Sequence, residues 1–190
     1  MRALVTFDCF DTVVTRAVGG TRGASHVLAE HLRRSDDAAL APLAAVPAEV
    51  LVSAHLRAEH LAYRRHGERR DLGHSSAQLA ELLGLPASAA PALRAAEEAV
   101  ELALTRPVPA QLDAVRAARA TGAQVGFLSD TALSSTALAA LLRRCGVLED
   151  GDLLWVSNEL GAEKGQGRAY AAVAAALGPQ RPPRGAWRHT

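Results

Sequence analysis

Three sets of polar residues follow three apolar runs of the sequence, and together they could carry out chemistry on a phosphoryl group. Asp8 comes directly after ALVTF, Ser129 and Asp130 end the stretch VGFLSD, and Lys164 lies in NELGAEKGQG after the third run. If each run is a strand of one parallel sheet, their carboxyl ends lie on the same edge and these side chains converge. A carboxylate nucleophile, a hydroxyl and an ammonium group are needed to attack a phosphoryl group and bind its oxygens.

Each of these residues has an ordinary structural interpretation when it is taken alone. Asp is common in the turn after a strand, a Ser-Asp pair is common at helix caps, and Lys after Glu is typical of a solvated surface. The order favours a site, because each residue follows its own predicted strand. In such a site Lys164 would keep Asp8 ionised, and the helix that begins near Gly165 would add backbone N–H donors for an anion.

The elements that must position these residues are predicted from apolar runs and helix-ending residues. Three continuously apolar runs rich in β-branched residues are typical of buried parallel strands: residues 3–7, 123–128 and 153–157. Ala-rich segments that end at a glycine are expected to be helices: residues 109–121, 134–145 and 165–177. This alternation predicts an α/β fold with a Rossmann-like parallel sheet.

Residues 18–105 have no convincing strand pattern and are predicted to be helical. Helices are expected over residues 25–34, 47–66, 75–83 and 88–105. Pro47 suits a first helical position, Ser75 or Ser76 a cap, and Gly84 a terminator. A helical block between two strands predicts a cap domain over the carboxyl edge of the sheet, where open α/β sheets bind ligands. The expected domains are a core of residues 1–17 and 106–190 and an inserted cap of residues 18–105.

Composition limits the function classes. The 190 residues carry a net charge of +1, which gives no electrostatic reason to expect nucleic acid or an anionic membrane as a partner. No apolar run reaches transmembrane length and Met1-Arg2 leads into a strand, so a cytoplasmic protein is expected. Aromatic residues make up only 4% of the chain, so the core must be built from Ala, Leu and Val. Cys9 and Cys145 lack metal-ligand spacing and are expected to be reduced, buried thiols.

The histidines and the basic residues near the predicted cap are interpreted as surface features. His55, His60 and His66 lack the spacing of a helical zinc motif, so surface positions are expected rather than metal coordination. The densest basic run, Arg57–Arg70, is expected to be a solvated helix face with its end. Arg16 is assigned either an anion contact or a surface role.

The chain resembles the haloacid dehalogenase (HAD) superfamily with a helical cap of the first type. The resemblance rests on FDCFDTVVTR, the helical insert after it, VGFLSD and the Lys in ELGAEKGQG. The closer likeness is to predicted HAD hydrolases whose first motif reads FDxFDT and whose second motif begins with SD. The resemblance implies that Asp8 is a nucleophile that forms an aspartyl intermediate. It also implies that Ser129, Asp130 and Lys164 bind the transferred group, that Thr12 supports the loop, and that Mg²⁺ binds at Asp8 and the backbone carbonyl of Phe10.

Two residues of the first motif bear on the chemistry. HAD phosphatases have an Asp two residues after the nucleophile, which protonates the leaving oxygen and later activates water, whereas this chain has Phe10. Asp11 lies one residue further on, so its side chain points elsewhere. A structural role is expected for Asp11, because Asp tolerates the left-handed backbone better than most residues. An aromatic residue at the position of Phe10 also occurs in the dehalogenase branch of the superfamily, which attacks carbon and needs no Mg²⁺.

The end of the sequence also departs from the family pattern. The family has an acidic motif after its fourth strand, and its carboxylates complete the Mg²⁺ site, whereas this sequence ends in GAWRHT where that strand should finish. The last core strand and the acidic loop are therefore expected to be cut short. Mg²⁺ normally needs more than one carboxylate, so Asp8 and the Phe10 carbonyl predict a weak or incomplete magnesium site.

Three functions follow from these observations, in decreasing order of preference. The first is a hydrolase, namely a phosphatase that acts on a small phosphorylated metabolite through Asp8. The second is a catalytically impaired HAD-like binding module or a fragment of a larger biosynthetic enzyme, suggested by the missing acid and the missing last motif. The third is a 2-haloacid dehalogenase-like hydrolase, suggested by Phe10 alone. The oligomeric state is left open.

Overall fold

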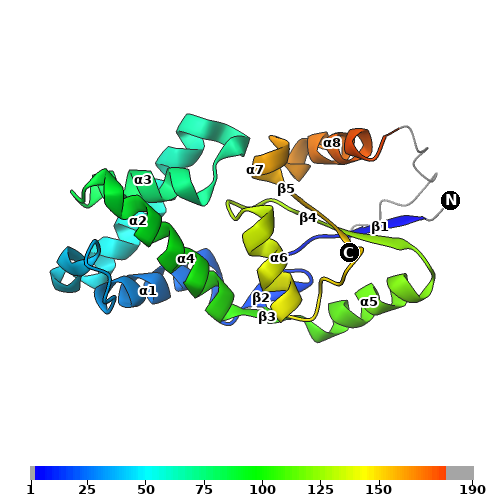
Figure 1. The fold of residues 1–190 in the computed structure, drawn as a ribbon, viewed down its shortest axis with the longest axis horizontal. Helices are drawn as coiled ribbons and strands as arrows, with labels where there is room; N and C mark the ends of the chain where they lie inside the picture. Colours follow the sequence, from blue (N-terminus) through cyan, green and yellow to red (C-terminus); the bar gives the residue numbers. More distant parts are fainter. Residues whose placement is uncertain (1–2, 179–190) are drawn as a thin grey trace. The chain divides into compact units, whose positions relative to one another are not determined.

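In the computed structural model, which describes residues 3–178, the chain forms two units (Figure 1). Within the described residues, one unit is formed by residues 3–15 and 105–178, and the other by residues 16–104. The predicted insert, residues 18–105, and this second unit differ by two residues at one end and one at the other. The predicted final strand around Trp187 lies outside the described residues.

The first unit is built on a parallel three-stranded sheet, which confirms the predicted α/β class. The strands are β1 (Leu4–Phe7), β4 (Gln124–Ser129) and β5 (Leu153–Val156), and their order is β1-β4-β5. Phe7 pairs with Phe127, and Ser129 pairs with Val156, so the carboxyl ends of the strands meet at one edge. The predicted strands were correct to within one residue at each end, because continuously apolar runs are typical of central parallel strands.

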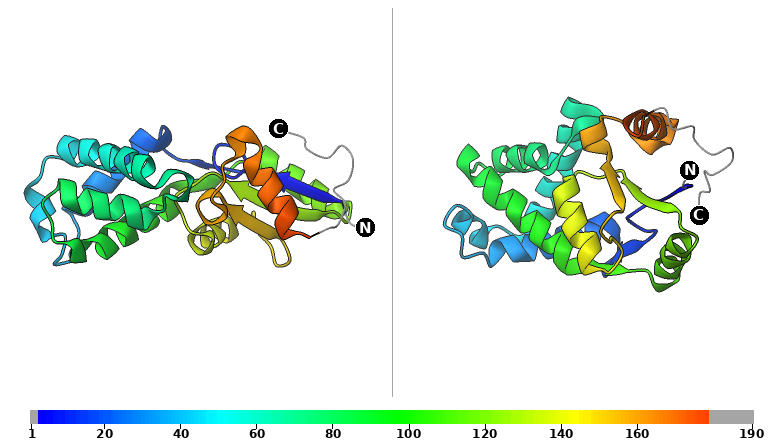
Figure 2. Two further views of the ribbon diagram at one scale, coloured as in Figure 1. Left: turned by 90° about the horizontal axis from the view of Figure 1, so that it is seen from above. Right: turned by 45° about the vertical axis from the view of Figure 1, so that its right-hand side comes forward.

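Helices follow the strands of this unit. They are α5 (Pro109–Ala120), α6 (Ser135–Arg144), α7 (Ser157–Leu160), the 3₁₀ turn η4 (Lys164–Gln166) and α8 (Arg168–Ala176). α5 and α8 lie on opposite sides of the sheet (Figures 1 and 2). The last predicted helix is a 3₁₀ turn followed by α8, because Gly167 takes a left-handed conformation, with φ of 73°, between them. The prediction that residue 157 ends a strand was wrong, since Ser157 begins α7.

The second unit, residues 16–104, is helical as predicted. It contains α1 (Gly20–Arg33), α2 (Ala48–His66), α3 (Leu72–Leu82) and α4 (Ala90–Leu104), with 3₁₀ turns η1 (Ala41–Ala45), η2 (Gly67–Arg69) and η3 (Ala87–Ala89). Its core is aliphatic, as composition predicted, and includes Leu28, Leu43, Leu51, Leu79 and Leu93. These leucines come from five different elements, so burial of one shared apolar core holds the helices together.

Several helix ends differ from the predictions. The third helix starts after Asp71 rather than at Ser75 or Ser76, because the Asp71 carboxylate accepts a hydrogen bond from the backbone N–H of His74 at 2.9 Å. His74 stands where a capping box normally has Glu or Gln, so the signal was easy to miss. Pro47 is the N-cap of α2 rather than its first helical residue.

Two short strands connect the units and were not predicted. β2 (Val14–Arg16) and β3 (Thr105–Pro107) pair as a two-stranded sheet. Thr105 was assigned to the end of a helix, but it is buried and starts β3, and its carbonyl accepts a hydrogen bond from Arg144 at 2.9 Å. Strands of three residues are too short to give an alternation pattern in the sequence.

Gly126 of β4 leaves room for the indole ring of Trp155 on the neighbouring strand. A Cβ atom added at Gly126 would lie 2.7 Å from Cζ3 of Trp155, which is too close for two carbon atoms that are not bonded to each other. We therefore expect Gly126→Ala to lower the free energy of unfolding by about 1–3 kcal/mol, through overpacking. Urea denaturation measures this effect. Gly165→Ala is the control, since an added Cβ there meets nothing within 4 Å; an equal loss in both variants would contradict the packing argument.

Among the described helices, none combines the length and the apolar character needed to cross a membrane.

Candidate active site

Asp8 is the first residue after β1, and its carboxylate is held by two donors. Its side chain is 41% exposed. Oδ1 accepts a hydrogen bond from the backbone N–H of Cys9 at 2.7 Å and lies 2.5 Å from Nζ of Lys164. Both contacts use the same oxygen, so Oδ2 has no donor among residues 3–178. The carboxylate is thus fixed in orientation by one oxygen, and the other oxygen can attack a substrate.

Lys164 begins the 3₁₀ turn η4, after β5 and α7, and its side chain reaches Asp8. Its Nζ also lies 3.5 Å from the carbonyl oxygen of Leu128, and its backbone N–H points at both carboxylate oxygens of Asp130, each at 3.2 Å. Asp130, directly after β4, therefore holds the backbone of the residue whose ammonium group pairs with Asp8. The structure brings these three predicted residues together at the carboxyl ends of β1 and β4.

Ser129 lies beside the nucleophile loop, with its side chain buried. It forms a hydrogen bond with the thiol of Cys9, the residue after Asp8. The structure thus places the Ser129 hydroxyl against the side chain of Cys9, one residue after Asp8. A substrate oxygen would have to compete with the Cys9 thiol, a weak acceptor and donor, for this hydroxyl.

The loop after Asp8 is a tight turn that depends on Asp11. Asp11 has a φ of +57°, and no other non-glycine residue among those described has a positive φ. This confirms the prediction of a left-handed structural role, and the Asp11 carboxylate accepts a hydrogen bond from Thr15 Oγ1 at 3.3 Å. The turn is closed by the backbone N–H of Thr12, which donates to the carbonyl of Cys9 at 3.3 Å. Thr12 therefore lies in the loop itself, and Phe10, two residues after Asp8, supplies a half-buried aromatic side chain and no carboxylate.

Three residues of α7 fix the loop after β4, and sequence reasoning missed all of them. The amide of Asn158 donates to the carbonyls of Thr131 and Leu133, each at 3.0 Å. Ser157 Oγ accepts from the backbone N–H of Thr131 at 3.2 Å, and Glu159 accepts from that of Ser135 at 2.7 Å. These hydrogen bonds join residues about 25 positions apart, so no local sequence pattern predicts them.

Tyr170 of α8 is a further residue near the site. Burial raises the pKa of its hydroxyl; the negative charges of Asp8 and Asp130 raise it further, and the charge of Lys164 acts in the opposite direction. The neutral hydroxyl remains a hydrogen-bond donor at neutral pH.

The described residues at this edge do not make a complete magnesium site. The two carboxylates, Asp8 and Asp130, both accept from Lys164. Within residues 3–178, no group of three His, Cys, Asp or Glu ligands occurs at this edge. Mg²⁺ requires near-octahedral oxygen ligands from more than one carboxylate or from substrate phosphate and water, so these donors alone do not fit it.

Cys9 is expected to be unreactive in the folded protein. Its side chain is fully buried, and burial raises its pKa to about 12; the charge of Asp8 adds to this, while the hydrogen bond with Ser129 and the charge of Lys164 oppose it. The thiolate is the reactive form, so at pH 8 native Cys9 should react with a disulfide reagent at least about a hundredfold more slowly than in urea. The Cys9→Ala variant shows how fast Cys145 alone reacts, so that the rate of Cys9 can be separated from it. Equal rates for native and unfolded protein would contradict this burial.

A scan against protein-family models found no match, and a search of curated proteins found none either. Solved structures do match. YfnB of Bacillus subtilis, assigned as a HAD hydrolase and solved bound to magnesium, superposes with a TM-score of 0.60 at 14% identity, over 94% of this chain and 75% of that one. L-2-haloacid dehalogenase from Xanthobacter autotrophicus, solved with chloropropionic acid covalently bound, gives 0.54 at 17% identity, over 94% of this chain and 66% of that one. The chain therefore has the fold of the HAD superfamily.

Proposed function

We propose that this chain with a HAD fold is a hydrolase, and that it removes phosphate from a small phosphorylated metabolite through an aspartyl intermediate at Asp8. The observation that carries the proposal is the Asp8 carboxylate at the end of β1, 2.5 Å from the ammonium group of Lys164. Such a pair holds the nucleophile in place, and the ammonium group would offset the charge of a bound phosphoryl group. The two free thiols fit the proposed cytoplasmic setting.

The proposed reaction has two steps. Oδ2 of Asp8 attacks phosphorus, and the bond between phosphorus and the leaving oxygen breaks, with the electron pair staying on that oxygen, which takes its proton from solvent water. A water molecule then attacks the aspartyl phosphate, which releases inorganic phosphate and restores the carboxylate. In the first step Lys164 and Ser129 would bind the phosphoryl oxygens. Asp130 would act indirectly, since it holds the backbone N–H of Lys164.

A second candidate function is hydrolysis of a carbon–halogen bond in a small haloacid. Three observations favour it: Phe10 in place of an acid, the incomplete set of metal ligands among residues 3–178, and the fold shared with a haloacid dehalogenase. Here Asp8 would displace halide from carbon, and water would hydrolyse the resulting ester. This reaction needs no protonated leaving group, because halide leaves as an anion.

Hydrolysis of a panel of phosphate esters with and without Mg²⁺, beside halide release from 2-haloacids without added metal, distinguishes the candidates. Phosphate release that stops in Asp8→Asn supports the phosphatase. Halide release that stops in the same variant supports the dehalogenase instead. If neither product forms and phosphorylated ligands only raise the melting temperature, the chain is a binding module and both catalytic proposals fail.

A further inference from the structure

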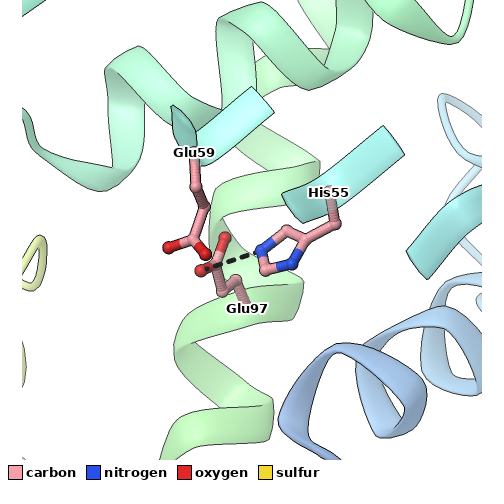
Figure 3. Close-up of side chains that lie close together, drawn as sticks. All are labelled: His55, Glu59 and Glu97. Carbon is pink, nitrogen blue, oxygen red and sulfur yellow. Dashed lines mark ion pairs between the residues drawn. The ribbon is translucent and has the colours of Figure 1, made fainter. Parts of the chain in front are cut away.

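A buried histidine and two glutamates converge between α2 and α4 of the helical unit (Figure 3). His55 and Glu59 lie one turn apart on α2, Glu97 lies on α4, and one possible ligand atom of each lies within 4.8 Å of the others. The side chains of His55 and Glu97 are 7% and 10% exposed, and that of Glu59 is 24% exposed. The sequence-based interpretation of His55 as a surface residue was wrong, because its ring is buried against Ser25 of α1 and Glu97 of α4, and contacts between helices cannot be inferred from sequence spacing.

The hydrogen bond on the far side of the ring fixes the form of His55. Its Nδ1 lies 3.0 Å from Oγ of Ser25, and that hydroxyl donates to the carbonyl of Thr21 at 3.0 Å. Since the hydroxyl has one proton and donates it to Thr21, it accepts from Nδ1–H. In the neutral ring the lone pair is therefore on Nε2, which faces the two glutamates. A metal-binding histidine is typically held in this way by a hydrogen bond to its other nitrogen.

Nε2 of His55 is fully buried, and no group in residues 3–178 meets it with hydrogen-bond geometry. It lies 3.3 Å from Oε1 of Glu97, an ion-pair distance that does not have hydrogen-bond alignment. Ligand atoms about 2.0 Å from a tetrahedral zinc ion lie roughly 3.3 Å from one another. The spacing of this nitrogen and oxygen is therefore already that of two ligands on one ion.

The charges around the cluster leave room for a cation. Glu59 pairs with Arg70 at 3.2 Å, and Glu101, one turn beyond Glu97, binds Arg16 at 2.9 Å. Glu97 has no Arg or Lys partner among residues 3–178. Three glutamates therefore face two arginines, which leaves one buried negative charge that is costly without a counter-ion. Burial lowers the pKa of His55, but Glu97, Glu59 and Glu101 raise it more, so either a protonated His55 or a bound cation can offset this charge.

We propose that His55 Nε2, Glu59 and Glu97 bind a divalent transition metal of the Zn²⁺ type, with water as the fourth ligand through the partly exposed side of Glu59. One imidazole and two carboxylates with an open position match the ligand types and number of three-ligand zinc sites, whereas Mg²⁺ prefers oxygen ligands throughout. The ion would join α2 to α4, so its first effect is on the stability of the helical unit. This site uses none of the residues of the proposed active site.

The test is a titration of the full chain, stripped of metal by a chelator, with Co²⁺ and then Zn²⁺. We expect one Co²⁺ per chain, with the intense visible absorption of a tetrahedral site that Zn²⁺ then removes. Zn²⁺ at about 100 times its dissociation constant should raise the melting temperature by roughly 5–10 °C. No visible band and no shift in the wild type would overturn the proposal.

Variants identify the ligands. His55→Gln, Glu97→Gln and Glu59→Gln should each weaken Co²⁺ binding at least about tenfold. Glu59→Gln serves as the test if either of the two buried variants fails to fold. His60→Gln, at an exposed position on the same helix, and Asp8→Asn should both keep the band. Binding that survives in a folded Glu97→Gln or Glu59→Gln, or that is lost in either control, would place the ion elsewhere and overturn the assignment.

Discussion

Asp8→Asn is expected to abolish turnover, with a fall in kcat of at least about a thousandfold, because an amide cannot form the covalent intermediate. The amide oxygen can still accept the hydrogen bond from the backbone N–H of Cys9, and the substitution does not change the size of the side chain. The fold should therefore persist while the chemistry stops. Product release is measured for the wild type and for Asp8→Asn. Mass spectrometry of acid-quenched protein should detect an aspartyl adduct only in the wild type.

Asp11→Asn is the matched control for this loss. Asp11 lies three residues away, is exposed, and has a left-handed backbone that Asn adopts as readily as Asp. An amide oxygen can also keep the hydrogen bond from Thr15. Activity should thus be retained within a few-fold. If Asp11→Asn is inactive and Asp8→Asn is active, the assignment of the nucleophile is wrong.

The parts of the fold that the sequence predicted depend on local pattern. Apolar runs marked β1, β4 and β5, and residues that take positive φ, such as Gly122 and Gly146, marked the ends of helices. The left-handed role of Asp11 followed from the backbone preference of one residue type. The positions of Asp8 and Lys164 at one sheet edge followed from strand polarity alone, because parallel strands end on the same side.

The parts that the sequence did not predict depend on contacts between distant segments. Asn158 is an ordinary polar residue until α7 places its amide against the loop after β4. Tyr170 and Glu97 resemble any residues of an amphipathic helix, and only packing brings them near Lys164 and His55, respectively. Ser129 was predicted as a group that binds substrate, but its partner in the structure is a thiol that no motif includes.

Phe10→Asp is expected to raise the turnover of alkyl phosphates by about a hundredfold, since general acid catalysis typically contributes that much or more. An alkoxide is a poor leaving group and needs a proton as it leaves, and Phe10 provides none. The substitution should not disrupt the turn, because the bonds to the Cys9 carbonyl come from the backbone N–H groups of Thr12 and Val14. The turnover of p-nitrophenyl phosphate should change far less, because its leaving group departs without a proton.

Phe10→Asn separates this acid effect from a change in size or polarity, since an amide cannot donate the proton as an acid does. The gain should be confined to Phe10→Asp and to substrates whose leaving group needs protonation. Equal gains in the Asn variant, or equal gains for alkyl and p-nitrophenyl esters, would contradict the role given to position 10. A dehalogenase would respond in the opposite direction, because a new carboxylate repels the carboxylate of a haloacid and should lower halide release. The sign of the change at this one position therefore distinguishes attack on phosphorus from attack on carbon.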